Sequence, residues 1–190
     1  FASIYGLIQD MQDVELRLSP DQTVYIINLN GEEAQRVLAL TADGARSAFE
    51  CSVSCIGGKT CQVGVRDSQA LLKKLVETEQ ENGFADGVLP KIHISGCPSS
   101  CGTHQIGAIG FHGGVKMIDK VPHPAFTLHF GGCDLQGHER MGEQVGVMLQ
   151  EQIPAFLVEM GQAAAKKHLS WECWAREYPG ELRAIVEKFA

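Results

Sequence analysis

The sequence predicts an α/β fold, of the α+β kind, in which a mixed or antiparallel sheet is covered by helices. Short segments rich in β-branched or alternating residues indicate strands, and longer segments with apolar residues at helical spacing indicate helices. The chain has 190 residues, enough for one or two compact domains with a real core. Its 44% hydrophobic and 21% charged residues are ordinary for a globular protein.

The first part of the chain predicts a small α/β segment. We place a domain boundary near residue 48 and expect one domain over residues 1–47 and a second over 48–190. The elements expected in the first domain are a helix or strand (1–13), a strand (22–29), a short helix (31–38) and a linker (41–47).

An amphipathic helix is predicted to begin after Asp67. Asp67 and Ser68 offer an N-cap, and leucine and valine residues recur at helical spacing over the next turns. Asn82 and Gly83 then stop the pattern.

Strands and helices are also expected in the rest of the second domain. Residues 91–95 alternate polar and apolar, so a strand delivers Cys97 at its end. The elements expected after it are strands over 106–118 and 125–130 joined through Pro122-His123-Pro124, a strand over 145–149, a helix over 152–167 with Pro154 in its first turn, and a terminal helical region capped by Ser170 and interrupted at Pro179-Gly180.

Four of the seven cysteines stand in two close pairs. Cys55 and Cys61 form a C-x5-C pair, and Cys97 and Cys101 form a C-x3-C pair. A cage of four thiolates is what an iron–sulfur cluster needs, and this spacing differs from the spacings typical of zinc ribbons and small ferredoxins. We therefore favour a cluster over a single zinc ion, with buried free thiols as the plain alternative.

Glycine and proline residues flank the paired cysteines. Glycine lets the backbone approach a bulky cofactor and adopt a positive φ without a Cβ penalty. Pro98 follows Cys97, so the segment to Cys101 is expected to turn sharply and not to extend the preceding strand. The glycines beside the thiols are Gly57, Gly58, Gly96 and Gly102.

At these residues the chain resembles the cluster-binding half of the siroheme-dependent nitrite and sulfite reductases. The family pattern is C-x5-C followed distantly by G-C-P-[NS]-x-C-G. The similarity continues into residues 105–111, which resemble a glycine-punctuated strand of the family. It also extends back into residues 14–22, and these resemble an R-L-(S/T)-P-x-Q turn of the family's short ferredoxin-like half-domain. It covers roughly residues 12–168. The first domain would then be a truncated ferredoxin-like half-domain, and the second a siroheme and 4Fe–4S domain.

The resemblance implies a 4Fe–4S cluster held by Cys55, Cys61, Cys97 and Cys101, with Cys101 as the bridge to the iron of siroheme. Electrons that enter at the cluster would then reach an anion on the far face of the haem. The implied activity is that of an oxidoreductase that reduces nitrite to ammonia or sulfite to sulfide.

Three further residues are candidates for contacts with siroheme. Siroheme carries carboxylates and its substrates are anions, so Arg or Lys must line the site. Lys59 and Arg66 are the basic candidates, and Gln105 matches nitrite-reductase-like members. A solvated lysine explains Lys59 equally well. His104 and His93 are interpreted as hydrogen-bonding, structural residues.

The chain holds no second copy of the paired-cysteine pattern. Family enzymes contain two such halves, and the basic residues that grip the substrate come largely from the other half. We therefore expect this chain to act with a missing N-terminal half, and no catalytic residue is assigned within it. Alone it is expected not to turn over substrate.

Charge and hydropathy limit the partners. The net charge of −7 argues against a nucleic-acid surface and does not help to dock an acidic ferredoxin. The expected electron donor is therefore a ferredoxin that binds outside this chain, a flavoprotein or another subunit. No apolar run approaches the ~20 residues of a membrane span, and no secretory signal is evident. With seven cysteines and no such signal, the expected location is the reducing cytoplasm.

Three other functions remain open. An electron-transfer module would hold the cluster without siroheme. A siroheme-type oxygenase of corrinoid biosynthesis shares the same motifs. A structural zinc domain would bind one metal ion through four thiolates.

Overall fold

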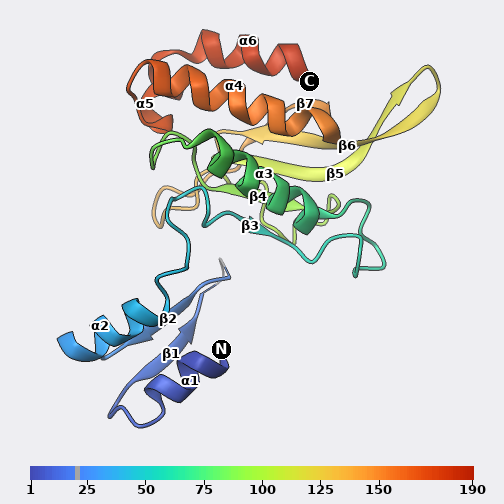
Figure 1. Cartoon of the computed structure of the whole chain (residues 1–190). Coiled ribbons are helices and arrows are strands. Elements are labelled where there is room, and N and C mark those ends of the chain that lie inside the picture. The colour runs from blue at the N-terminus through green and yellow to red at the C-terminus, as the bar shows by residue number, and fades with distance from the viewer. Residues whose placement is uncertain (20–21) are drawn as a thin grey trace. The chain divides into compact units, whose positions relative to one another are not determined.

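The computed structural model describes residues 1–19 and 22–190, and the chain divides into two compact units, residues 1–45 and 46–190. Figure 1 labels the elements of both units. The predicted R-L-S-P-x-Q turn includes Pro20 and Asp21, which lie outside the described residues.

The first unit combines an antiparallel hairpin with two helices. Its elements are α1 (Ala2–Ile8), β1 (Glu15–Leu18), β2 (Val24–Ile27) and α2 (Gly31–Leu40). A capping box starts α2, because the Asn30 side chain accepts hydrogen bonds from two backbone amides while the Glu33 carboxylate accepts one from the Asn30 amide. The strand and the helix expected after residue 22 are confirmed.

The second unit contains a five-stranded sheet and four α-helices. Its elements are β3 (Val53–Ser54), α3 (Ser68–Asn82), β4 (Ile92–Ser95), β5 (Ile109–Ile118), β6 (Val121–Phe130), β7 (Glu143–Leu149), a short 3-10 helix (Gln150–Gln152), α4 (Ile153–Lys166), α5 (Trp171–Glu177) and α6 (Pro179–Phe189).

The sheet is mixed, with strand order β3-β4-β5-β6-β7. The first three strands run parallel to one another, and β6 and β7 continue the sheet in antiparallel fashion. The predicted α/β class with a mixed sheet covered by helices is confirmed.

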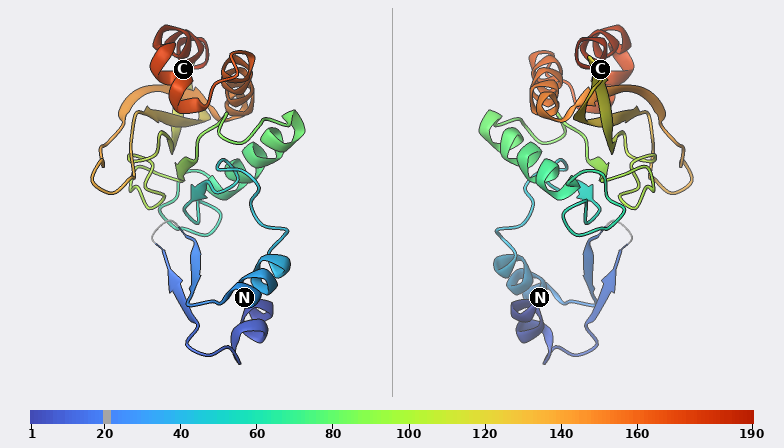
Figure 2. Two further views of the ribbon diagram at one scale, coloured as in Figure 1. Left: turned by 90° about the vertical axis from the view of Figure 1, so that its left-hand side faces the viewer. Right: turned by 90° about the vertical axis from the view of Figure 1, so that its right-hand side faces the viewer.

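One face of the sheet forms the core with the helices. Figures 1 and 2 show α3, α4 and α6 on the same side of the strands. Apolar side chains from the strands and helices join a single buried cluster. Its members with no exposed surface include Leu75, Ile92, Ile109, Phe126, Phe156 and Trp174.

The opposite face of the sheet carries polar side chains and is covered by the segment after β4. His93 and Ser95 alternate with the core residues Ile92 and Ile94 along β4, and both are buried. Glycine allows the covering segment to approach, because a Cβ on Gly107 would lie 2.8 Å from the Cδ2 atom of His93.

The caps predicted for α3 are confirmed. The Asp67 side chain accepts a hydrogen bond from the Ala70 amide, and Gly83 ends the helix with φ +61°, in the left-handed region. Both ends of this helix therefore follow from local chemistry.

The predicted joint between two strands was wrong. Pro122 and Pro124 lie inside β6, and the chain turns at Asp119 and Lys120, whose φ angles are 49° and 66°. Proline is tolerated here because β6 pairs with β7 only from Ala125 onward, so one edge of the strand is open at both prolines.

The helices at the end of the chain follow the predicted signals. Pro154 lies in the first turn of α4, the Ser170 side chain caps α5, and Pro179 begins α6. Within residues 1–19 and 22–190, no helix has the length and apolar character needed to cross a membrane.

Candidate functional site

Both cysteine pairs begin just after neighbouring strands. Cys55 follows Ser54, the last residue of β3, and Cys97 follows β4 after one glycine. Because β3 and β4 are parallel, both loops leave the same edge of the sheet. The expectation that the pairs emerge from loops at strand ends is confirmed.

The two cysteine loops touch through their backbones at Gly96. The Gly96 amide donates a hydrogen bond to the Cys55 sulfur at 3.1 Å. The Gly96 carbonyl accepts hydrogen bonds from the amides of Val65 and Arg66 at 3.0 and 2.8 Å. A Cβ on Gly96 would lie 3.1 Å from the Cα of Gly57. The first loop is therefore folded around the residue that precedes Cys97.

The first loop is a tight turn that depends on glycine. Gly57 has φ +67°, and its carbonyl accepts a hydrogen bond from the Cys61 amide at 2.9 Å. A Cβ on Gly57 would lie 2.7 Å from the Ser68 nitrogen. Any other residue would therefore clash there and would also be strained by the positive φ.

The second loop folds back onto β4, which confirms the sharp turn predicted between Cys97 and Cys101. The Gly102 amide donates to the Ser95 hydroxyl at 3.1 Å. A Cβ on Gly102 would lie 2.1 Å from the Ile94 carbonyl oxygen, which only glycine avoids.

The four candidate ligands differ in burial. Cys97 is buried, Cys55 and Cys61 are half-buried and Cys101 is exposed. Among the described residues, no three of these thiols lie close enough together to hold one metal ion. A 4Fe–4S cluster binds each thiolate at a different iron and so spaces them more widely.

The surroundings of Cys55 favour its thiolate form. Burial acts to raise the pKa of this thiol, but the hydrogen bond with the Ser68 hydroxyl and those from the Gly96 and Gly57 amides outweigh burial and lower the pKa. The thiolate is the form that binds metal, and amide donors to sulfur also tune iron–sulfur clusters. The donor set and the glycine-lined approach therefore fit a thiolate-held cluster.

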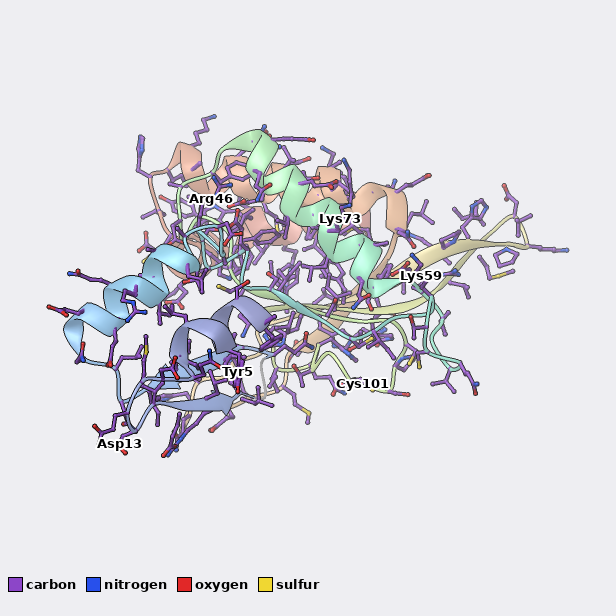
Figure 3. The ribbon with its side chains drawn as sticks, turned by 60° about the horizontal axis from the view of Figure 1, so that its bottom comes forward. Tyr5, Asp13, Arg46, Lys59, Lys73 and Cys101 are labelled. Atoms are coloured by element: carbon purple, nitrogen blue, oxygen red, sulfur yellow. The ribbon has the colours of Figure 1, made fainter. Side chains whose placement is uncertain are left out.

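The three predicted siroheme contacts have different surroundings. Lys59 is exposed on the loop between β3 and α3, and Cys101 lies on the loop after β4; Figure 3 labels both. The Arg66 Nε donates to the Gly114 carbonyl on β5 at 2.8 Å. The Gln105 carbonyl accepts a hydrogen bond from the Gly142 amide at 2.7 Å. Their contact with siroheme stays a prediction.

A separate cavity of about 1030 Å³ lies near the start of β4. Its wall includes Lys91, His93 and Arg140. Asp134 lies 3.9 Å from the Lys91 ammonium and 3.6 Å from the His93 ring. None of the predicted ligands or siroheme contacts lines this cavity.

The interpretation of the sequence missed two histidines near the second loop. His112 and His129 lie with His104 on the polar face of the sheet. His104 does make the expected hydrogen bond, to Ser95 at 2.9 Å. The available signal was the alternation of side chains along a strand. Phe111 and Leu128 are core residues, so their neighbours His112 and His129 point to the other face of the sheet.

Comparisons with known proteins give relatives of one kind. No family model matches the chain. The sulfite reductase [NADPH] hemoprotein beta-component of Bacillus subtilis (strain 168) is 32% identical over 110 residues, which are 52% of this chain and 19% of the relative. The protein of the same name from Actinobacillus succinogenes is 26% identical over 176 residues, 86% of this chain and 26% of the relative.

A solved structure shares the fold. The Mycobacterium tuberculosis NirA protein superposes with a TM-score of 0.70 and 18% identity, over 95% of this chain and 36% of that protein. The chain thus spans about a fifth to a quarter of the length of these curated relatives. The related sequences and the shared fold together support membership of this chain in the nitrite/sulfite reductase family.

Proposed function

We propose that this chain is the cluster-bearing part of a siroheme-dependent nitrite or sulfite reductase. The observation that carries the proposal is the contact between the two cysteine loops, in which the Gly96 amide donates to the Cys55 sulfur. The names of the sulfite reductase hemoprotein relatives support the reaction class. Because the chain spans only part of their length, we propose the activity for a larger protein that contains this chain.

In this proposal Cys55, Cys61, Cys97 and Cys101 would hold a 4Fe–4S cluster, and Cys101 would also contact siroheme. When bound, these groups would pass electrons from an external donor to nitrite or sulfite. Amide donors lower the pKa of the Cys55 thiol, which favours the thiolate, and Cys97 is buried. Cys101 is exposed, which leaves its sulfur accessible to a second group.

The cationic residues near the loops have a binding role in this proposal. Lys59 is exposed on the first cysteine loop, where its ammonium can meet a carboxylate of siroheme. Arg66 is held by β5 and adds positive charge beside the same loop. Gln105 lies just beyond the second loop and completes the proposed set of siroheme contacts.

The partners follow from the chemistry that this chain lacks. The other half of the enzyme would supply the basic residues that grip the anion. A ferredoxin or a flavoprotein would supply electrons. Because this chain has a net charge of −7 and would repel an acidic ferredoxin, such a ferredoxin would dock on the rest of the enzyme. We expect this chemistry in the reducing cytoplasm.

Anaerobic reconstitution with iron and sulfide tests the cluster. The wild-type chain should take up about four iron and four sulfide per chain and show visible charge-transfer absorption. Cys97→Ser should lose both, because a buried thiolate ligand is removed. Cys51→Ser is the matched control, since Cys51 is exposed and lies outside the pairs. Equal uptake by wild type and Cys97→Ser would reject the assignment.

Addition of siroheme to the reconstituted chain tests the second cofactor. Binding with a shifted Soret band that Cys101→Ser weakens would support the reductase. A full cluster with no siroheme binding would favour an electron-transfer module. One zinc per chain, no colour and thiolate coordination would favour a structural zinc domain.

A further inference from the structure

Three histidines from three separate segments meet on the polar face of the sheet. His112 on β5 pairs with Thr127, and His129 on β6 pairs with Gly110, so the two imidazoles are diagonal neighbours on one face. His104 reaches them from the segment after the second cysteine loop. Gly110 permits this approach, because a Cβ there would lie 1.8 Å from the His104 carbonyl oxygen.

The three rings are close enough to share one ion. One ring nitrogen from each of His104, His112 and His129 lies within 4.8 Å of the others. The ring centroids are 4.8 to 5.1 Å apart, and the His112 Nδ1 lies 3.0 Å from the His129 Nε2. Only 1% of the His104 surface and 7% of the His129 surface are exposed.

The environment keeps these imidazoles in the neutral form that binds metal. Burial, followed by the proximity of the other histidines, lowers the pKa of His104 to about 4. Burial and His129 lower the pKa of His112, and burial lowers that of His129. A neutral imidazole offers one nitrogen lone pair.

The hydrogen bonds around the cluster orient the rings but do not satisfy all of them. The Ser95 hydroxyl lies 2.9 Å from the His104 Nδ1, which leaves Nε2 on the other side of the ring. A hydrogen bond at the second ring nitrogen is typical of a metal-bound histidine. Among the buried side-chain nitrogen and oxygen atoms of the described residues, the His129 Nδ1 has no hydrogen-bond partner. A buried ring nitrogen without a hydrogen-bond partner is uncommon in folded proteins and calls for an explanation.

We propose that His104, His112 and His129 form a binding site for a divalent transition metal ion such as zinc, which three imidazoles can ligate. Zinc binds histidine nitrogen at about 2.0–2.1 Å, which in a tetrahedron puts two such nitrogens about 3.3–3.4 Å apart. The His112 and His129 nitrogens are already near this spacing at 3.0 Å. The His104 nitrogen lies within 4.8 Å of the other two, so it would move closer when an ion binds, and a fourth ligand would complete the tetrahedron.

The bound ion would tie the segment that carries His104 to two strands of the sheet. This segment follows directly after Cys101 and Gly102, so the ion would hold the second cysteine loop in place. The site differs from the thiolate cage in its donor atoms, and it stands whether or not the chain holds a cluster.

Equilibrium dialysis of the metal-free 190-residue chain against zinc chloride at pH 7.5 tests the proposal. Wild type should bind one zinc more per chain than His112→Asn or His129→Gln. In His112→Asn, the amide nitrogen takes the place of Nδ1 and keeps a hydrogen-bonding group beside His129, so the loss reports the missing ligand. His138→Gln is the control, because His138 is exposed and lies outside the cluster.

Two further measurements separate this site from the cysteines. With cobalt in place of zinc, ligation by imidazole gives only weak d–d bands, whereas thiolates add intense charge-transfer bands. The species lost in His112→Asn should show only the weak bands. Ser95→Ala, which removes the partner of His104, should weaken zinc binding about 10–100-fold.

The outcomes are decisive in both directions. Zinc should raise the melting temperature of wild type and of His138→Gln but not of His112→Asn, and circular dichroism of each variant checks its fold. Equal zinc content in wild type and His112→Asn would overturn the proposal. It would also be overturned if the extra zinc were held by thiolates and disappeared in Cys97→Ser.

Discussion

The Gly96 amide donates a hydrogen bond to the sulfur of Cys55 at 3.1 Å. This contact joins the residue before Cys97 to the first cysteine of the other pair, across the 15 residues of α3 and the segments that flank it. The parallel pairing of β3 with β4 makes the contact possible, because it brings the ends of both strands to one edge of the sheet.

A side chain at Gly96 should separate the two cysteine loops. In Gly96→Ala the new Cβ would lie 2.6 Å from the Arg66 carbonyl oxygen, so we expect a loss of about 1–3 kcal/mol in unfolding free energy and weaker iron uptake. Urea unfolding and iron analysis measure these effects. Gly114→Ala is the control, because nothing lies within 4 Å of a Cβ there. Equal losses in both variants would contradict this account.

The hairpin between β5 and β6 can be stabilised at its turn. Asp119 and Lys120 both have positive φ, as in a type I′ turn, where glycine is favoured at the second position. Lys120→Gly should therefore raise the unfolding free energy by about 0.5–1 kcal/mol, as measured by the urea midpoint. Lys116→Gly, in the middle of β5, should lower it by a similar amount. A loss in Lys120→Gly would show that the turn has another conformation.

Glu79 makes the stability of the second unit depend on pH. Burial raises the pKa of this carboxyl against the hydrogen bond from the Ser47 hydroxyl, and nearby Glu50 raises it further. The folded state therefore disfavours ionisation of the Glu79 carboxyl. Its stability falls as pH rises from the pKa of this group in the unfolded chain, about 4.5, through its higher pKa in the folded chain.

Glu79→Gln removes this penalty. Its melting temperature should exceed that of wild type by about 1–3 °C at pH 7, and the difference should disappear at pH 4, where both forms are neutral. Thermal unfolding at the two pH values measures this. Glu81→Gln, at an exposed position of the same helix, should show no such change. A wild type more stable than Glu79→Gln at pH 7 would show that folding does not raise the pKa of Glu79.

The packing of α3 on the sheet should be a main source of stability. Leu75 has no exposed surface, so Leu75→Ala should cost about 2–5 kcal/mol in urea unfolding. Leu135 is 61% exposed, and Leu135→Ala should change stability by less than about 0.5 kcal/mol. Similar losses at both positions would mean that the core lies elsewhere.

Local chemistry in the sequence was enough to predict α3 and the class of the fold, whereas residues 1–13, which contain α1, were expected to be a helix or a strand. The Asp67 cap, the apolar spacing along α3 and the Gly83 stop act within a few residues, so they can be interpreted without the partner surfaces. The identity and spacing of the four paired cysteines likewise indicated thiolate chemistry, and the turn after Cys97 followed from Pro98 and the nearby glycines.

Strand pairing decided what the sequence could not show. Val53 and Ser54 form a strand only because β4 lies beside them, and Pro122 and Pro124 are tolerated in β6 because β7 stops short of them. Neither condition is visible in the residues themselves, since pairing depends on distant segments.

The proximity of functional side chains was also decided by the tertiary structure. The hydrogen bond between Gly96 and Cys55 needs the parallel pairing of β3 and β4, and the cluster of His104, His112 and His129 needs the register of β5 on β6 and a loop folded over both. Residue type and spacing determine which atoms can bind a metal. Sheet order and register determine which of those atoms meet, because they bring together parts of the chain that local preferences cannot relate.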